Sequence, residues 1–145
     1  MASRPLLFLV EGLSGQRAVN DVAVSALDER IARVLVAVGA RPDERWTVAK
    51  LAKIAGLSRA AFARRFAAEV GVPPLRHVAA VRMCRAAKLL AQLDASLADI
   101  AASVGYANEF ALSRAFHRLV GVPPGAYRRM VRAVTSSSRP CCLAA

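Results

Sequence analysis

The sequence predicts an all-α protein in which two helix-turn-helix units are joined by a long linker helix. The first observation is a repeat, because VGVPP occurs at Val70–Pro74 and again at Val120–Pro124. The second is that the residues before each copy follow one helical pattern of apolar, glycine and large core residues. The third is that no glycine or proline occurs between Pro74 and Gly105. A duplicated helical unit on either side of one long helix accounts for all three.

The first unit consists of two helices separated by a glycine turn. Apolar residues of its first helix repeat at the spacing of one helix face: Val48, Leu51, Ala52 and Ala55. Thr47 is a good N-cap for this helix, and Gly56 can close its end in a left-handed conformation. Ser58 then caps a second helix, in which Phe62 and Phe66 are four residues apart and point to a core.

The linker between the units is predicted to be one helix over residues 74–93. Pro74 suits the first position of a helix, where its missing N–H would be unpaired anyway. At 1.5 Å per residue such a helix is about 30 Å long. Successive major-groove segments on one face of DNA lie about 34 Å apart. The linker can therefore hold two helix-turn-helix units one turn of DNA apart.

The second unit repeats the first with a shift of 49 residues in its first helix. The matching apolar face is Leu97, Ile100, Ala101 and Val104. Ser96 is the predicted N-cap, and this helix is expected to end at Gly105. Asn108 caps the next helix, whose Leu112 and Phe116 point inward. In such a unit the first helix braces the second, which can then project into a major groove.

Composition favours a polyanionic partner. The net charge is +11, carried mostly by arginine, which suits nucleic acid or an acidic membrane surface; a basic surface without a partner is the alternative. The three cysteines lack metal or disulfide spacing, and His77 and His117 are read as surface or phosphate-side residues without metal partners. No phosphate loop, carboxylate pair or nucleophile–base pair is evident, so no enzyme, cofactor or metal is predicted. No signal peptide or membrane span is evident, which favours the cytoplasm.

Three stretches resemble the DNA-binding region of the AraC/XylS family of bacterial transcription regulators: WTVAKLAKIAGLSRAAFARRF, RMCRAAKLL and LADIAASVGYANEFALSRAFHRLVGVPPGAYRR. The resemblance covers residues 28–132 and implies about seven helices and binding to asymmetric promoter sites. It places helix-turn-helix units at 47–69 and 97–120, on either side of the 74–93 linker. Residues 1–27 are read as a leader or a remnant of an effector domain, and residues 133–145 as a disordered tail. We therefore expect no small-molecule effector to bind this chain.

Residues opposite the inward side chains of each second helix are the candidates for contact with DNA bases. They are Arg59, Ala60, Ala63 and Arg64 in the first unit, and Glu109, Phe110, Ser113 and Arg114 in the second. Arg64 and Arg114 match the O6 and N7 acceptors of guanine. The alternatives are that both arginines bind phosphate, that Glu109 only faces the helix dipole, and that Phe110 is packed.

Candidate contacts with the DNA backbone are Ser58, Arg65, Arg82, Arg85, Asn108, His117 and Arg118. From Leu51 to Leu93 eight basic residues face one acidic residue, whereas from Asp94 to Arg132 five face three. The first unit and the linker should therefore supply most of the nonspecific affinity for phosphate. Trp46 is interpreted as an anchor ahead of its unit, with a base-stacking platform as the alternative.

The sequence thus predicts a transcription regulator that inserts two recognition helices into adjacent major grooves of double-stranded promoter DNA. RNA polymerase is the expected protein partner, and the expected location is the bacterial cytoplasm at the nucleoid. The alternative is a truncated regulator that acts as an interaction module with RNA polymerase or a full-length relative. A basic domain on a membrane surface is a third and weaker reading, because the apolar faces form globular seams. Binding to DNA at low salt separates the first two readings.

Overall fold

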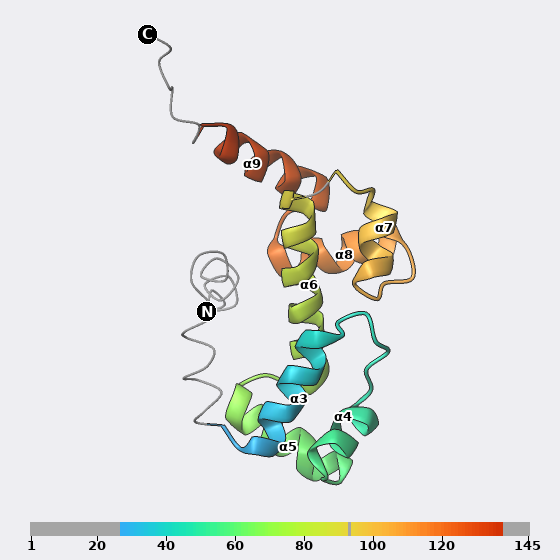
Figure 1. Ribbon diagram of the computed structural model, residues 1–145, viewed down its shortest axis with the longest axis vertical. Coiled ribbons are helices and arrows are strands. Elements are labelled where there is room, and N and C mark those ends of the chain that lie inside the picture. Colours follow the sequence, from blue (N-terminus) through green and yellow to red (C-terminus); the bar gives the residue numbers. More distant parts are fainter. Residues whose placement is uncertain (1–26, 93, 138–145) are drawn as a thin grey trace.

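The computed structural model describes residues 27–92 and 94–137, and the regular structure in these ranges consists of seven helices without strands. They are α3 (Glu29–Ala40), α4 (Val48–Ala55), α5 (Arg59–Val70), α6 (Pro74–Gln92), α7 (Leu97–Ser103), α8 (Glu109–Val120) and α9 (Pro124–Ser137). Helix α6 forms a central rod, with α3, α4 and α5 around its first half and α7, α8 and α9 around its second half (Figure 1). The predicted all-α fold with two helix-turn-helix units is confirmed.

The described residues form two hydrophobic cores, one for each unit. The first contains Ile31, Val34, Val38, Leu51, Ala52, Ala55, Phe62, Phe66 and Val78. The second contains Met83, Ala86, Ala87, Leu90, Ile100, Ala101, Val104, Leu112, Ala115 and Phe116. Helix α6 contributes to both. Val78 lies five residues before Met83, so the two side chains leave the helix about 140° apart. The two cores therefore use different faces of one rod.

The predicted N-caps are confirmed. Each accepts a hydrogen bond from the backbone N–H three residues later, at 3.2 Å for Thr47, 3.2 Å for Ser58, 3.1 Å for Ser96 and 2.9 Å for Asn108. These bonds satisfy N–H groups that have no partner within the helix. They fix where four of the helices begin.

The glycine turns of the two units have the same hydrogen-bonding pattern. Gly56 and Gly105 are both left-handed, with φ of 66° and 83°. The residue after each glycine donates its N–H to a carbonyl five residues back, Leu57 to Ala52 at 3.0 Å and Tyr106 to Ala101 at 2.9 Å. This is the Schellman closure of a helix. Helix α7 ends at Ser103, slightly ahead of the predicted glycine, but its closure matches that of α4.

The last helix extends further along the chain than predicted. The disordered tail predicted from residue 133 is wrong for residues 133–137, because α9 continues to Ser137. No glycine or proline occurs from residue 126 to 139, and Thr135 donates its hydroxyl to the Val131 carbonyl at 2.9 Å without breaking the helix. The end of the predicted linker at residue 93, the leader up to residue 26 and the tail from residue 138 lie outside the described residues.

His77 is packed rather than exposed, which corrects its prediction as a surface residue. It lies in α6 next to Phe66, with ring centroids 5.6 Å apart in an edge-on arrangement. Burial lowers the pKa of the imidazole from its ordinary value of 6.5, because the charged form loses its hydration.

This burial predicts a pH-dependent stability. The unfolded chain binds a proton at His77 more readily than the folded chain. The free energy of unfolding therefore keeps its full value above pH 6.5 and falls as the pH drops below it. We expect the thermal midpoint of the wild type to fall more than that of His77→Leu between about pH 7.5 and 5. His117→Leu, which removes an exposed imidazole, is the control and should follow the wild type. Equal pH dependence of wild type and His77→Leu would contradict the prediction.

Candidate nucleic-acid interface

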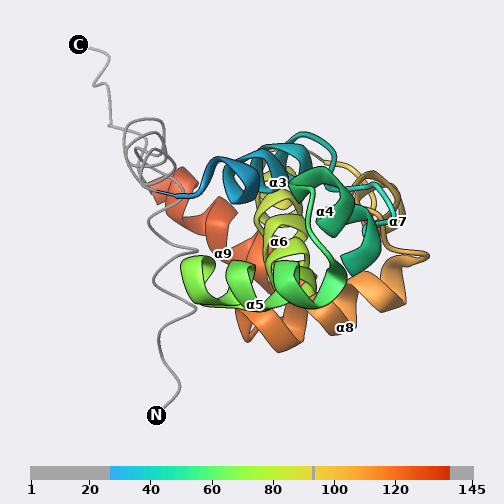
Figure 2. The same ribbon diagram turned by 90° about the horizontal axis from the view of Figure 1, so that it is seen from below.

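The second helices of the two units, α5 and α8, lie on the same side of α6 (Figure 2). Helix α3 lies on the opposite side (Figure 2). The inward residues were predicted correctly, because Phe62, Phe66, Leu112 and Phe116 are all buried. Burying this side of each helix leaves the opposite side available to a partner.

The candidate base contacts of α5 lie on its outer side. Arg59, Ala60 and Arg64 are exposed and Ala63 is half-buried. Because the side chains of the two alanines are short, a partner can approach the helix backbone closely between the arginines. An exposed guanidinium is free to make the bidentate contact that guanine offers in the major groove.

The outer side of α8 has a different character. Phe110 is 69 % exposed, which excludes its packing in the core. Arg114 is exposed as well, while Glu109 and Ser113 are half-buried. Glu109 is the first residue of α8, where its charge also opposes the helix dipole. The outer face of α8 therefore offers a partner one apolar side chain and one positively charged side chain.

The candidate backbone contacts fall into two groups. Arg85, His117 and Arg118 are exposed, and Ser58 and Asn108 occupy helix N-termini, where free N–H groups favour anions. Arg65 is already paired, with Nη2 3.0 Å from Asp28 Oδ2 and Nε 3.4 Å from Glu69 Oε1. A phosphate would have to compete with both carboxylates for Arg65.

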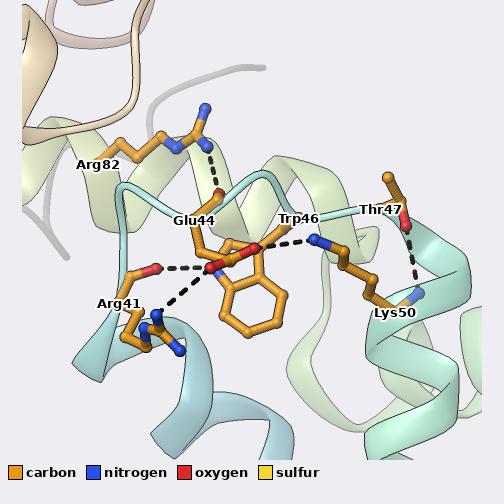
Figure 3. Close-up of polar contacts among 6 residues, drawn as sticks. All are labelled: Arg41, Glu44, Trp46, Thr47, Lys50 and Arg82. Carbon is orange, nitrogen blue, oxygen red and sulfur yellow. Dashed lines mark hydrogen bonds and ion pairs between the residues drawn. The ribbon is translucent and has the colours of Figure 1, made fainter.

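Arg82 is a correction to the predicted set. Its Nε donates to the Pro42 carbonyl at 2.8 Å and its Nη2 to the Glu44 carbonyl at 2.9 Å, as Figure 3 shows for Glu44. The guanidinium also lies over the Tyr106 ring, 5.5 Å from its centroid. Because Arg82 points into the protein and donates from Nε and Nη2 there, it does not face a phosphate as predicted.

Sequence reasoning missed the role of the loop between α3 and α4. Trp46 anchors this loop, as predicted, by donating its ring N–H to the Arg41 carbonyl at 2.8 Å (Figure 3). Glu44 pairs with Lys50 of α4 at 2.8 Å and with Arg41 at 3.7 Å (Figure 3). The hydrogen bond and charge of Lys50 hold the pKa of Glu44 below its ordinary value. The tryptophan was the only sequence signal for this ordered loop.

Two basic residues of α9 are also occupied within the protein. Arg128 donates to the Ala95 carbonyl at 2.6 Å, and Arg132 pairs with Asp94. The hydrogen bond from Arg132 lowers the pKa of the Asp94 carboxyl. Both arginines tie α9 to the loop before α7. The charge available to a partner is therefore smaller than a count of basic residues implies.

Residues 27–92 and 94–137 contain neither a metal site nor a membrane-spanning helix. No group of three His, Cys, Asp or Glu residues there is placed to hold a metal ion. Within the same ranges, no helix has the length and apolar character needed to cross a membrane.

These features define a class: a tandem helix-turn-helix domain with two outward-facing second helices. A family model described as a helix-turn-helix domain matches residues 51–130, more than half of the chain. The chain belongs to the AraC family of helix-turn-helix transcription regulators.

Relatives of the same family support this assignment. An AraC-like transcription regulator of Streptomyces lividans is 44 % identical over 112 residues, which are 77 % of this chain and 37 % of that protein. The RCS-specific transcriptional activator RclR of Escherichia coli K12 is 39 % identical over 106 residues, 73 % of this chain and 37 % of its own length. The chain thus spans little more than a third of the length of these relatives.

Solved structures agree with the fold. The DNA-binding domain of the global transcriptional factor AdpA, crystallised with a target DNA, has a TM-score of 0.70 and 32 % identity. That match covers 79 % of this chain and 99 % of the AdpA domain. The C-terminal domain of AraT, a response regulator of Geobacillus stearothermophilus, has a TM-score of 0.69 and 26 % identity over 72 % of this chain and 88 % of that domain.

Proposed function

We propose that the protein regulates transcription by binding promoter DNA, with α5 and α8 each in one of two adjacent major grooves. The observation that carries this proposal is the placement of both helices on the same side of α6 (Figure 2). Helix α6 has 19 residues and is about 28 Å long, close to the spacing of about 34 Å between major-groove segments. A similar domain, that of AdpA, was crystallised with its target DNA.

Base recognition is assigned to the outer sides of the two helices. Arg64 and Arg114 each bind a guanine through O6 and N7. Ala60 and Ala63 lie against thymine methyl groups, next to Arg59. On α8, Phe110 contacts a thymine methyl, and Glu109 accepts from the N4 amine of cytosine, with Ser113 at the edge of the contact. The arrangement gives the two grooves different chemistry, so the binding site is asymmetric.

Contact with phosphate is assigned to exposed basic side chains and to the helix N-termini. Arg85, His117 and Arg118 bind phosphate oxygens, while Ser58 and Asn108 mark the N-termini of α5 and α8, where backbone N–H groups face an anion. These contacts orient the domain without reading sequence. Such a regulator acts in the bacterial cytoplasm, on the nucleoid.

RNA polymerase is the proposed protein partner. Val36 on α3 is 66 % exposed, and α3 lies on the side of α6 away from α5 and α8 (Figure 2). An apolar side chain placed there remains accessible when the other side holds DNA. The same observation favours the second candidate function, an interaction module that pairs with polymerase or with a full-length relative without reading DNA itself.

Selection of bound duplexes from a random pool tests the proposal. Two sequence boxes about one helical turn apart are expected, with binding that weakens steeply as salt rises. A single box would mean that only one unit reads DNA. Absence of binding even at low salt would contradict DNA recognition and favour the interaction module.

Arg85→Ala should weaken binding to every duplex about equally. Loss of one phosphate contact reduces the slope of log K against log salt by roughly one and leaves the preferred sequence unchanged. Titration of the selected and a scrambled duplex at several salt concentrations measures both effects. A changed base preference would show that Arg85 touches a base.

A further inference from the structure

The two cores are joined through α6, and contacts outside the cores add to this connection because the first core holds the helix weakly. Helix α6 contributes one buried residue, Val78, to the first core and four to the second, Met83, Ala86, Ala87 and Leu90. Among the described residues, no buried residue belongs to both cores, and α6 is the element common to both. Arg82 lies on α6 between Val78 of the first core and Met83 of the second. It is therefore at the boundary of the two units.

Arg82 contacts both units from this boundary. Its guanidinium donates to the Pro42 and Glu44 carbonyls, which belong to the loop of the first unit, at 2.8 and 2.9 Å. The same group lies over the ring of Tyr106, which follows the glycine turn of the second unit and packs against the second core. The planar fork of a guanidinium can hold two acceptors and a ring at once, which a lysine ammonium cannot reproduce.

Gly105 allows the glycine turn of the second unit to lie close to the α3–α4 loop of the first unit. A Cβ placed on Gly105 would lie 2.8 Å from the Asp43 carbonyl oxygen, 3.0 Å from Asp43 Cα and 3.0 Å from Arg82 Nη2. Contacts under 3.0 Å with backbone require the backbone to move. Gly56, the matching glycine of the first unit, has no such neighbour within 4 Å. The close approach is thus particular to the second unit, where its turn meets the loop of the first.

We propose that Arg82 is a positioning residue that locks the two helix-turn-helix units in one relative orientation and so sets the spacing between DNA boxes that the protein accepts. The inference rests on the proposed function, because spacing has a meaning only if both units read DNA. Once one unit is bound, the orientation of the other determines the effective concentration at its own box. A loose joint spreads the second unit over many orientations and lowers that concentration.

Arg82→Met tests this role, because methionine keeps an apolar stem and removes the hydrogen-bond donors. Affinity is measured for the selected two-box duplex, for duplexes with one base pair added or removed between the boxes, and for each box alone. We expect affinity for the correctly spaced duplex to fall about tenfold, with less than about twofold change on a single box. The preference for the correct spacing should shrink accordingly.

Lys88→Met is the matched control, because it removes one positive charge from an exposed position of the same helix. It should keep the wild-type preference for spacing, whatever it does to overall affinity. A merely electrostatic role of Arg82 would make the two variants behave alike.

A second pair of variants tests the contact between the two units from the side of the second unit. Gly56→Ala and Gly105→Ala both place a side chain on a left-handed residue, and both should lower stability. Only Gly105→Ala also places a methyl group too close to Asp43 and Arg82, so only this variant should reduce the preference for spacing.

The outcomes separate the two proposals. If the wild type prefers one spacing and both Arg82→Met and Gly105→Ala keep that preference while folded, the role of Arg82 is overturned and the two-groove function stands. If the wild type shows no preference for spacing, the two-groove function is overturned, and the role of Arg82 with it. Circular dichroism melts establish that each variant is folded at the temperature of the assay.

Discussion

Replacement of Phe116 by alanine is expected to unfold the second unit. Phe116 is fully buried and packs edge-on against Tyr127, with ring centroids 5.4 Å apart. Truncation of a buried phenylalanine costs about 3–5 kcal/mol, whereas small domains are stable by about 5–15 kcal/mol. The loss is therefore a large part of the free energy of unfolding.

Phe66→Ala should have the same effect on the first unit. Phe66 is 1 % exposed and lies between Phe62 and His77, with centroid distances of 5.5 and 5.6 Å. Since the two cores share no buried residue among those described, each loss should be local. In Phe66→Ala, hydrogen exchange should accelerate in α3, α4 and α5 before it does in α7 and α8.

Thermal melting with Phe110→Ala as the control measures both effects. Phe110 lies on the same helix as Phe116 but is 69 % exposed, so its truncation removes little buried surface. Phe110→Ala should melt close to the wild type, while the two buried variants melt far below it. Equal melting of all three variants would mean that the inner and outer sides of the helices are assigned wrongly.

Arg64→Ala should remove sequence discrimination at one base pair of the first box. Arg64 is exposed on the outer side of α5, opposite the buried Phe62 and Phe66. Loss of a bidentate contact with guanine costs about 1–3 kcal/mol on the cognate site and relaxes the preference at that position. Affinity for a scrambled duplex should change far less.

Arg64→Lys separates charge from geometry at the same position. Lysine keeps the charge but lacks the planar fork, so discrimination should be reduced while the salt dependence stays near that of the wild type. Both variants are measured on cognate and scrambled duplexes at several salt concentrations. If Arg64→Ala weakens both duplexes equally, Arg64 is a phosphate anchor and another residue of α5 reads the base.

Arg114→Ala should act in the same way on the second box, with a smaller effect. Arg114 is the counterpart of Arg64 on α8, but this helix also carries the acidic Glu109, and two arginines of its unit, Arg128 and Arg132, are occupied within the protein. The weaker positive field around α8 supports less phosphate binding, so less of the total affinity depends on this unit.

The helices, their caps and their inner faces could be predicted because they depend on neighbours within one or two turns. Thr47, Ser58, Ser96 and Asn108 accept their hydrogen bonds from N–H groups three residues away. The spacing of apolar residues likewise determines which side of a helix is buried. The duplication strengthened each assignment, since the same signals occur twice. The all-α tandem fold and the outward faces of α5 and α8 follow from such local rules.

The roles of individual arginines could not be predicted, because an arginine on a helix surface looks the same in sequence whether it meets water, phosphate or protein. Arg65 pairs with Asp28, which precedes α3, and Arg82 donates to a carbonyl 40 residues earlier in the chain. Both partners are placed by packing that brings distant segments together. The exposure of Phe110 was also open in the sequence.

The sequence by itself determined the fold, the family resemblance and the candidates for contact with DNA bases, because periodicity, capping and turn chemistry act over short distances. Only the tertiary structure showed which basic residues remain available and which hold the protein together. It also placed Gly105 against Asp43 and Arg82 between the two units. These contacts arise where α6 joins the two separate cores, and a junction of that kind leaves no periodic pattern in the sequence.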